Sequence, residues 1–346
     1  MNLFSFLAYF PDALLVFLLS LILVITTAAQ FTRRLEMLCE ELGLSIGMLS
    51  LFSSLGANIP NYAASAAAIV SGHSDTGLGI IIGSNIYNIA IILGLCMLLS
   101  PQHGGIRLSI PARRDVFVIA CYNGFIACFV LAVVATLPGA SLFMGTHKQI
   151  SLSLLHMGIS GGTFVIFGAL LVHILRRSHG NAETAVHSYE LLPRKSPLVL
   201  LRLGAEVLFF LAIALVGVLF MVQAGQALTT DIHLPSTLAG LLVLAVATSL
   251  PNTVVAVGLV RTGEAAACLE EISSSNSVNG VLGIVLPLIF WQSSVRDHLL
   301  LLLDSPLLLV LTLLVLFAVW RGHMSRRLGI VLLCVYIGWV VVRFVV

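Results

Sequence analysis

The sequence predicts an all-α integral membrane protein with about ten transmembrane helices, arranged as two inverted five-helix repeats. Three observations support this fold class. Of the 346 residues, 59% are hydrophobic and only 9% are charged, and mean hydropathy is +1.09. Apolar runs repeatedly reach the length of about 20 residues that a helix needs to cross a bilayer. A polar motif also occurs twice, once in each half of the chain.

Apolar runs and the charged, proline or glycine breaks between them predict ten helices. These are expected at residues 11–32, 46–70, 77–99, 115–137, 151–175, 200–225, 236–260, 271–292, 304–320 and 326–346. We interpret the first run as a membrane helix rather than a cleaved signal peptide. No basic residue precedes it, and it is longer than the usual apolar core of a signal peptide.

A polar segment divides the chain into two halves. We expect a first repeat over residues 1–177 with its motif at 56–88, a cytoplasmic linker over 178–199, and a second repeat over 200–346 with its motif at 247–279. Five helices per half is an odd number, so the second half enters the membrane from the opposite side. The repeats are therefore predicted to be inverted.

The positions of lysine and arginine predict the orientation, because cytoplasmic loops retain an excess of both. With the N-terminus outside, 14 of the 17 fall on the cytoplasmic side, and only Lys148, Arg296 and Arg343 lie outside. Both termini are then non-cytoplasmic, and a plasma or cell inner membrane is favoured over an organellar one. Basic residues at helix ends, rather than on one face, argue against a nucleic-acid partner. The oligomeric state is not predicted.

The repeated motif combines a proline-broken helix with a helix rich in small and amide residues. The first copy reads Gly56-Ala57-Asn58-Ile59-Pro60-Asn61, then Gly83-Ser84-Asn85-Ile86-Tyr87-Asn88. The second reads Ala247-Thr248-Ser249-Leu250-Pro251-Asn252, then Ser274-Ser275-Asn276-Ser277-Val278-Asn279. Every matched pair is separated by 191 positions. Such a duplication in an apolar chain is typical of secondary transporters, whose substrate site lies between internal repeats.

The motif has the chemistry of a cation site. A proline inside a helix frees a carbonyl four residues earlier, which here means Gly56 and Ala247. Polar residues four positions apart line one helix face, and converging faces would form a box of oxygens, the ligands that hard cations take. The expected cation-binding residues are Ala57 and Thr248, through backbone oxygens, and Asn58, Asn61, Ser84, Asn88, Ser249, Asn252, Ser275 and Asn279. Alternatively, these side chains only hold helices together.

These residues resemble the motifs of the calcium/cation antiporter superfamily, which includes the sodium/calcium exchangers. Its two repeats read roughly G-T-S-x-P-E, then a glycine, then G-S-N-x-x-N. The motifs cover about a fifth of this chain, and the ten-helix architecture extends the resemblance to nearly all of it. The resemblance implies exchange of Na⁺ against Ca²⁺ or a related cation by alternating access, with the first and sixth helices sliding against the core. It implies no enzyme activity and no cofactor. The transported cations, Na⁺, H⁺ or Ca²⁺, are substrates, and the partners are the lipid bilayer and inorganic cations.

The sequence departs from the family motif at its most charged position. Asn61 and Asn252 stand where the family has a glutamate in each repeat, so the site loses two formal negative charges. Calcium sites in proteins are tuned by the number of carboxylates. A neutral site therefore favours a monovalent ion, or an atypical substrate, over Ca²⁺.

Three other glutamates are candidate accessory carboxylates. Glu270 and Glu271 are expected at the start of the eighth helix, about one turn before Ser275, and Glu206 a little inside the sixth helix. Ionisable groups at membrane depth are rare without a role, so these residues are candidates for a relocated cation or proton site. The alternative is that all three are solvated at the interface.

Two other classes of function stay open at this stage. A non-transporting scaffold or regulatory homologue could keep the fold after losing its ion ligands. Remotely, Gly158-Ile159-Ser160-Gly161-Gly162 matches G-x-S-x-G and suggests an intramembrane serine protease, with His173 or His233 as the base. Close packing of helices explains those glycines more simply. The six cysteines show no CxxC spacing, and no zinc or iron site is predicted.

Overall fold

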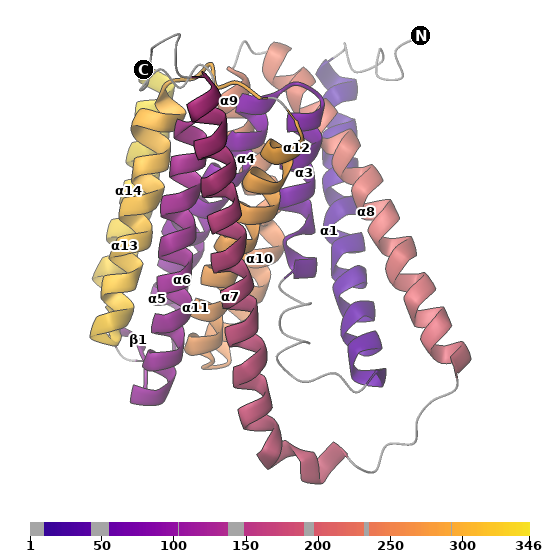
Figure 1. The fold of residues 1–346 in the computed structure, drawn as a ribbon, viewed down its shortest axis with the longest axis vertical. Coiled ribbons are helices and arrows are strands. Elements are labelled where there is room, and N and C mark those ends of the chain that lie inside the picture. Colours follow the sequence, from indigo (N-terminus) through magenta and orange to yellow (C-terminus); the bar gives the residue numbers. More distant parts are fainter. Residues whose placement is uncertain are drawn as a thin grey trace.

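The structure is a computed structural model that describes residues 10–42, 55–102, 104–137, 149–189, 197–231, 235–291 and 293–346. These residues form a bundle of long helices (Figure 1). In the described ranges, nine helices are long and apolar enough to cross a membrane, and the shorter apolar helix Ile59–Val70 accompanies them. The predicted all-α, multi-pass membrane fold is confirmed. Part of the expected second helix, residues 46–54, lies outside the described residues.

The elements of the first half surround the first motif. They are α1 (Phe10–Glu41), α3 (Ile59–Val70), α4 (Ser74–Tyr87), the π-helix η2 (Asn88–Leu93), α5 (Gly94–Leu99), the strand β1 (Gly105–Arg107), α6 (Ile110–Ala135) and α7 (Gln149–Tyr189).

The second half carries the second motif. Its elements are α8 (Pro197–Asp231), α9 (Ser236–Leu238), η3 (Ala239–Leu244), α10 (Ala245–Arg261), α11 (Ala265–Val278), η4 (Asn279–Val285), α12 (Leu286–Phe290), η5 (Leu300–Asp304), α13 (Ser305–Arg321), β2 (His323–Ser325) and α14 (Arg326–Val345).

Several boundaries differ from the sequence expectation. Helix α11 begins at Ala265 rather than near residue 271, because Gly263 turns the chain at φ +89° and Glu264 stands at the N-cap. Glu270 and Glu271 therefore lie inside the helix, not at its start. Helix α7 continues to Tyr189, into the segment expected as a linker, and α8 begins at Pro197. The antiparallel strands β1 and β2 were not expected.

The two motif regions run in opposite directions through the bundle. In Figure 1, α4 lies near the end of the bundle where α1 begins and α14 ends, and α5 lies near the other end. By contrast, α11 lies near that other end and α12 lies near the end where α1 begins. The chain thus descends through α4 and α5 and ascends through α11 and α12. This is the arrangement that an inverted repeat requires.

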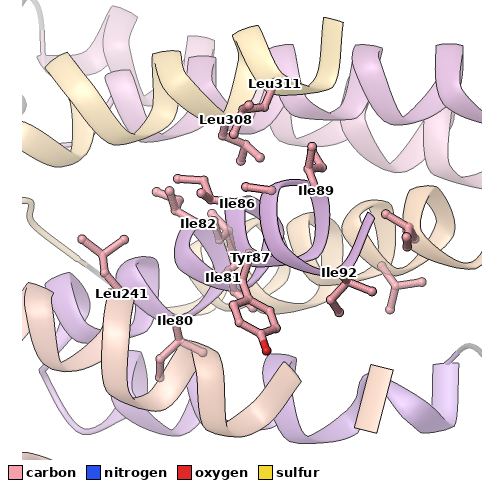
Figure 2. Close-up of a cluster of buried hydrophobic side chains, with 14 of the residues drawn as sticks. Ile80, Ile81, Ile82, Ile86, Tyr87, Ile89, Ile92, Leu241, Leu308 and Leu311 are labelled. Atoms are coloured by element: carbon pink, nitrogen blue, oxygen red, sulfur yellow. The ribbon is translucent and has the colours of Figure 1, made fainter. Parts of the chain in front are cut away.

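Helix α4 is the centre of the packing. Every one of its residues is buried, as expected for a helix that is apolar on all sides. In Figure 2, Ile82 and Ile86 of α4 face Leu308 of α13, whereas Ile80 lies beside Leu241 of η3. Neighbouring helices therefore enclose α4, and its few polar residues are held away from lipid and bulk water.

Glycines let α4 approach η3 with backbone against backbone. A Cβ atom on Gly83 would overlap the carbonyl oxygen of Leu241, and one on Gly240 would overlap that of Thr76. Small residues at such crossings allow the close approach that stabilises helix pairs in membranes. These glycines fix the distance between an element of the first half and an element of the second.

A buried arginine of α14 forms ion pairs with two aspartates, one in η5 and one in the segment before it. Arg343 is 4% exposed, and its guanidinium forms ion pairs with Asp297 at 2.6 Å and with Asp304 at 3.6 Å. Trp339 Nε1 donates to Asp304 Oδ1 at 2.8 Å. Burial alone would raise the pKa of Asp297. Hydrogen bonds from Arg343 and Thr237 and the arginine charge outweigh burial, so this pKa lies below its usual value.

The glycine crossing generates a stability prediction. Gly240→Ala should lower the free energy of unfolding by about 1–3 kcal/mol, because the added methyl group has to displace backbone atoms of α4. Gly124→Ala on α6 is the matched control, since a Cβ atom there meets nothing within 4 Å. Thermal unfolding of the purified proteins in detergent measures both. Equal midpoints for the two variants would contradict the tight crossing.

Candidate functional site

Buried polar residues from four helices, α4 among them, meet inside the bundle. They belong to α3, α4, α10 and α11 or to the residues that flank these helices, and each is at most 5% exposed. We refer to them as the amide cluster. Its members are Asn58, Asn61, Ser84, Asn85, Asn88, Thr248, Ser249, Asn252, Ser275, Asn276 and Asn279.

A reciprocal pair of hydrogen bonds joins α4 to α11. Asn85 Nδ2 donates to the backbone oxygen of Asn276 at 3.1 Å, and Asn276 Nδ2 donates to the backbone oxygen of Asn85 at 3.4 Å. The two residues are 191 positions apart, so they are equivalent members of the two repeats. The internal repeat of the sequence is therefore also a pseudo-symmetric contact in space.

Two further bonds follow the same symmetry. Asn88 Nδ2 donates to Asn276 Oδ1 at 2.9 Å, and Asn279 Nδ2 donates to Asn85 Oδ1 at 3.1 Å. Because both amides use their nitrogen in this way, their Oδ1 atoms are left over, and neither has a hydrogen-bond partner in the structure. Two buried carbonyl oxygens, one from each repeat, are thus available to a ligand.

Asn58, at the N-cap of α3, links that helix to α10 and α11. Its Oδ1 accepts from Asn252 Nδ2 at 2.9 Å and from Asn61 Nδ2 at 3.4 Å. Its Nδ2 donates to Ser275 Oγ at 2.8 Å. The side chain of Asn58, which belongs to the first repeat, therefore bridges α10 and α11 of the second repeat.

This second set also contains unpartnered oxygens. Ser84 Oγ donates to Asn61 Oδ1 at 3.2 Å, which occupies that oxygen. Asn252 Oδ1 and Ser249 Oγ are buried and have no hydrogen-bond partner. An unpaired buried polar oxygen costs about 1–3 kcal/mol, so several in one cluster indicate a place for a ligand or for water.

A π-helical turn begins at the equivalent residue of each repeat. Helix η2 starts at Asn88 and η4 starts at Asn279. A π-turn inserts one residue into an α-helix, disturbs its regular hydrogen bonds and often occurs at functional sites. In this structure the turns occur where each helix presents an unpartnered amide oxygen to the cluster.

The two motif prolines play different structural roles. Pro60 lies in the first turn of α3, where its missing N–H leaves no bond unmade. Pro251 lies inside α10, which continues from Ala245 to Arg261. Thr248 Oγ1 donates to Leu244 O at 2.8 Å, within its own helix. Backbone ligation by Ala57 and Thr248 stays a prediction.

The three candidate accessory carboxylates have different surroundings. Glu271 Oε1 accepts from Ser275 Oγ at 3.1 Å, which connects this carboxylate to the cluster. Glu270 precedes it in the second turn of α11. Glu206 of α8 forms an ion pair with Arg34 of α1 at 3.1 Å and a second one with Arg202 of its own helix at 2.8 Å. The described contacts of Glu206 thus hold two peripheral helices together rather than reaching the cluster.

Sequence reasoning omitted three residues that the structure places at or beside the cluster. Asn85 and Asn276 stood inside the quoted motif, one position after Ser84 and Ser275, and their shared spacing was the available signal. Asn123 of α6 accepts from Ser277 Oγ at 3.3 Å and lines a small cavity behind Asn85 and Asn276. An isolated asparagine in an apolar helix gave no signal of this.

The protease alternative lacks its geometry. Ser160 and His173 both lie on α7, thirteen residues apart, which separates them by about 20 Å along a helix axis. A catalytic base has to lie within hydrogen-bond reach of its nucleophile. His233, the other proposed base, lies outside the described residues.

The chain that contains the amide cluster matches one known protein family over most of its length. The sequence profile named Sodium/calcium exchanger protein matches residues 12–176 and 205–345. The chain belongs to this family. Its members are transporters, so this chain is a membrane transport protein rather than an enzyme.

The matches to individual relatives and to a solved structure cover nearly the whole chain. Inner membrane protein YrbG of Escherichia coli is 26% identical over 94% of this chain and 95% of its own. Sodium/calcium exchanger MaX1 of Methanosarcina acetivorans is 24% identical over 95% of this chain and 98% of its own. The structure of the sodium-calcium exchanger NCX_Mj, soaked with 10 mM Na⁺ and zero Ca²⁺, superposes with a TM-score of 0.61 at 18% identity, covering 96% of this chain and 99% of that one. The fold is therefore shared.

The reciprocal pair of Asn85 and Asn276 predicts energetic coupling between the repeats. Asn85→Ala and Asn276→Ala should each destabilise the protein, because each leaves buried amide groups of the other helix unpaired. The double variant should lose about 0.5–3 kcal/mol less than the sum of the two single variants.

Thermal unfolding of the four proteins measures this coupling. Ser65→Ala combined with Asn85→Ala is a control, since Ser65 bonds to Gly77 O and Gly283 O rather than to Asn85. Strictly additive losses for Asn85 and Asn276 would contradict the pairing.

Proposed function

We propose that this protein is a secondary active cation antiporter that carries a monovalent cation through the amide cluster by alternating access. The observation that carries the proposal is the set of buried, unpartnered oxygens that the two repeats contribute between them. These are Oδ1 of Asn88, Asn252 and Asn279 and Oγ of Ser249. Amide and hydroxyl oxygens at membrane depth are suitable ligands for a hard cation.

The charge of the cluster supports the choice of valence. Its side chains are all amides or hydroxyls, including Asn61 and Asn252 at the positions of the family's glutamates. The cost of removing an ion from water rises with the square of its charge, so a divalent ion costs about four times as much as a monovalent ion of similar size. Neutral oxygens offset the smaller cost more readily. Na⁺ is the first candidate, with H⁺ or another cation as the exchanged partner.

The peripheral helices support a sliding mechanism. Helices α1 and α8 make their most extensive contacts with each other, and they stand together at one flank of the bundle (Figure 1). The Arg34–Glu206 ion pair joins them. They are suited to move as one unit past the rigid core that contains α4, and so to expose the cluster to each side in turn.

The membrane topology is part of the proposal. We place both termini on the non-cytoplasmic side, following the distribution of lysine and arginine. The two repeats occupy residues 1–177 and 200–346, and the polar segment 178–199 between them is cytoplasmic. A bacterial relative named as an inner membrane protein supports a plasma or inner membrane location.

Ion flux in proteoliposomes tests this function. Uptake of ²²Na⁺ driven by a Na⁺ or proton gradient is expected for the wild type, and Asn61→Ala and Asn252→Ala should each reduce it about tenfold or more, because each removes an amide from the cluster. Gly124→Ala is the control outside the cluster. If folded wild-type protein carried no Na⁺, Ca²⁺ or H⁺, the antiporter assignment would be wrong, and a non-transporting scaffold that keeps the fold would replace it.

Restoring the lost charges provides a complementary test. The double substitution Asn61→Glu and Asn252→Glu adds two carboxylates where the family motif has them, so ⁴⁵Ca²⁺ uptake should rise relative to ²²Na⁺ uptake. The double substitution to glutamine matches the added side-chain length without the charge and should leave the ratio near the wild-type value. Substantial Ca²⁺ transport by the wild type would refute the monovalent assignment.

A further inference from the structure

Two residues beside the site break the internal symmetry of the repeats. With a spacing of 191 positions, Asn58 corresponds to Ser249 and Glu271 corresponds to Ile80. Other positions of the cluster do match, since Ser84, Asn85 and Asn88 of the first copy correspond to Ser275, Asn276 and Asn279 of the second. The second copy therefore has a carboxylate, and the first copy an extra amide, where their counterparts have neither.

The structure joins these two exceptional residues through one hydroxyl group. Ser275 Oγ accepts from Asn58 Nδ2 at 2.8 Å and donates to Glu271 Oε1 at 3.1 Å. The equivalent serine, Ser84, donates to Asn61 Oδ1 instead. Glu271 thus takes the hydrogen that the repeat symmetry would have directed from Ser275 to Asn252. The consequence is visible at Asn252, whose Oδ1 has no partner.

The direction of these bonds follows from the carboxylate. A cation bound at the site favours the ionised form of Glu271, and an ionised carboxylate only accepts hydrogen bonds, whereas a serine hydroxyl has one hydrogen and two acceptor lone pairs. Because Glu271 takes the hydrogen, Ser275 can present only lone pairs to the cluster. Asn58 must then offer its nitrogen to Ser275 and its oxygen to the nitrogen of Asn252. Asn252 is the last residue in this series of hydrogen bonds. Its Nδ2 atom donates to Asn58, and its Oδ1 atom stays available to a ligand.

We propose that Glu271 is a positioning and specificity-determining residue of the cation site. It orients the chain Ser275–Asn58–Asn252 so that oxygens rather than N–H groups face the ion, and it adds a negative charge to a cluster whose own side chains are neutral. One charge beside the site balances one monovalent cation. This proposal rests on the proposed function, and it places the selectivity of the site in a residue between the two polar stretches, 247–252 and 274–279, of the second motif.

Cation binding to the purified protein tests the proposal separately from transport. Binding to the folded state raises the unfolding temperature in proportion to the logarithm of ligand concentration over its dissociation constant. Thermal unfolding in detergent is followed while NaCl replaces choline chloride at constant ionic strength, and the Na⁺ dissociation constant is fitted from the rise. This constant is the Na⁺ concentration at which half of the sites are occupied, called below the half-maximal Na⁺ concentration. Glu271→Gln keeps the shape and removes the charge, so the half-maximal Na⁺ concentration should rise about tenfold, and Glu271→Asp should restore part of the difference.

Glu264→Gln is the matched control. Glu264 is exposed and lies two turns earlier on the same helix, so this change removes the same charge without touching Ser275. Its half-maximal Na⁺ concentration should equal that of the wild type. A merely structural role for Glu271 would lower the unfolding temperature without Na⁺ and leave the half-maximal concentration unchanged, which would overturn the proposal.

Two further outcomes are decisive. If Glu271→Gln does not fold, Ser275→Ala breaks the same link while keeping the carboxylate, and an unchanged half-maximal Na⁺ concentration in that variant would refute the orienting role. If wild-type protein shows no Na⁺-dependent stabilisation, the role of Glu271 fails whatever the flux assay shows. Flux in the wild type together with equal Na⁺ binding by wild type and Glu271→Gln would leave the transport function standing and remove only Glu271 from it.

Discussion

The paired amides of Asn85 and Asn276 are the constraint on which the centre of this protein depends. Inside a bilayer, a polar group without a partner costs several kcal/mol, so an asparagine buried in the core has to find its bonds within the protein. These two residues satisfy each other across the repeat interface. The glycines that bring α4 against η3, and the apolar residues that enclose α4, keep water and lipid away from this pair.

Much of this arrangement could be predicted, because a duplicated sequence states which residues are equivalent. The common spacing of 191 positions predicted that two motifs would face each other, and the cluster does bring Asn61, Asn252, Asn88 and Asn279 together with their serines. Long apolar runs ended by charges also gave good boundaries. The last helix was expected at 326–346, and α14 spans Arg326–Val345.

Other features depend on local geometry that hydropathy does not encode. The start of α11 is set by the left-handed conformation of Gly263, and this places Glu271 inside the helix instead of at its start. The direction in which each amide points depends on its neighbours, so the oxygens that remain unpartnered could not be read from residue types. The strands β1 and β2 are three residues each, too short to give an alternating pattern.

The departure from symmetry at Asn58 and Glu271 has an energetic consequence for the whole cycle. In a protein made of two identical inverted halves, exchanging the conformations of the halves would produce an inward-open and an outward-open state of equal free energy. Here the link Asn58–Ser275–Glu271 has no counterpart in the other repeat. In the alternating-access mechanism that we propose, the two states would therefore differ in free energy even without ions, and the protein would rest on one preferred side when no ion is bound.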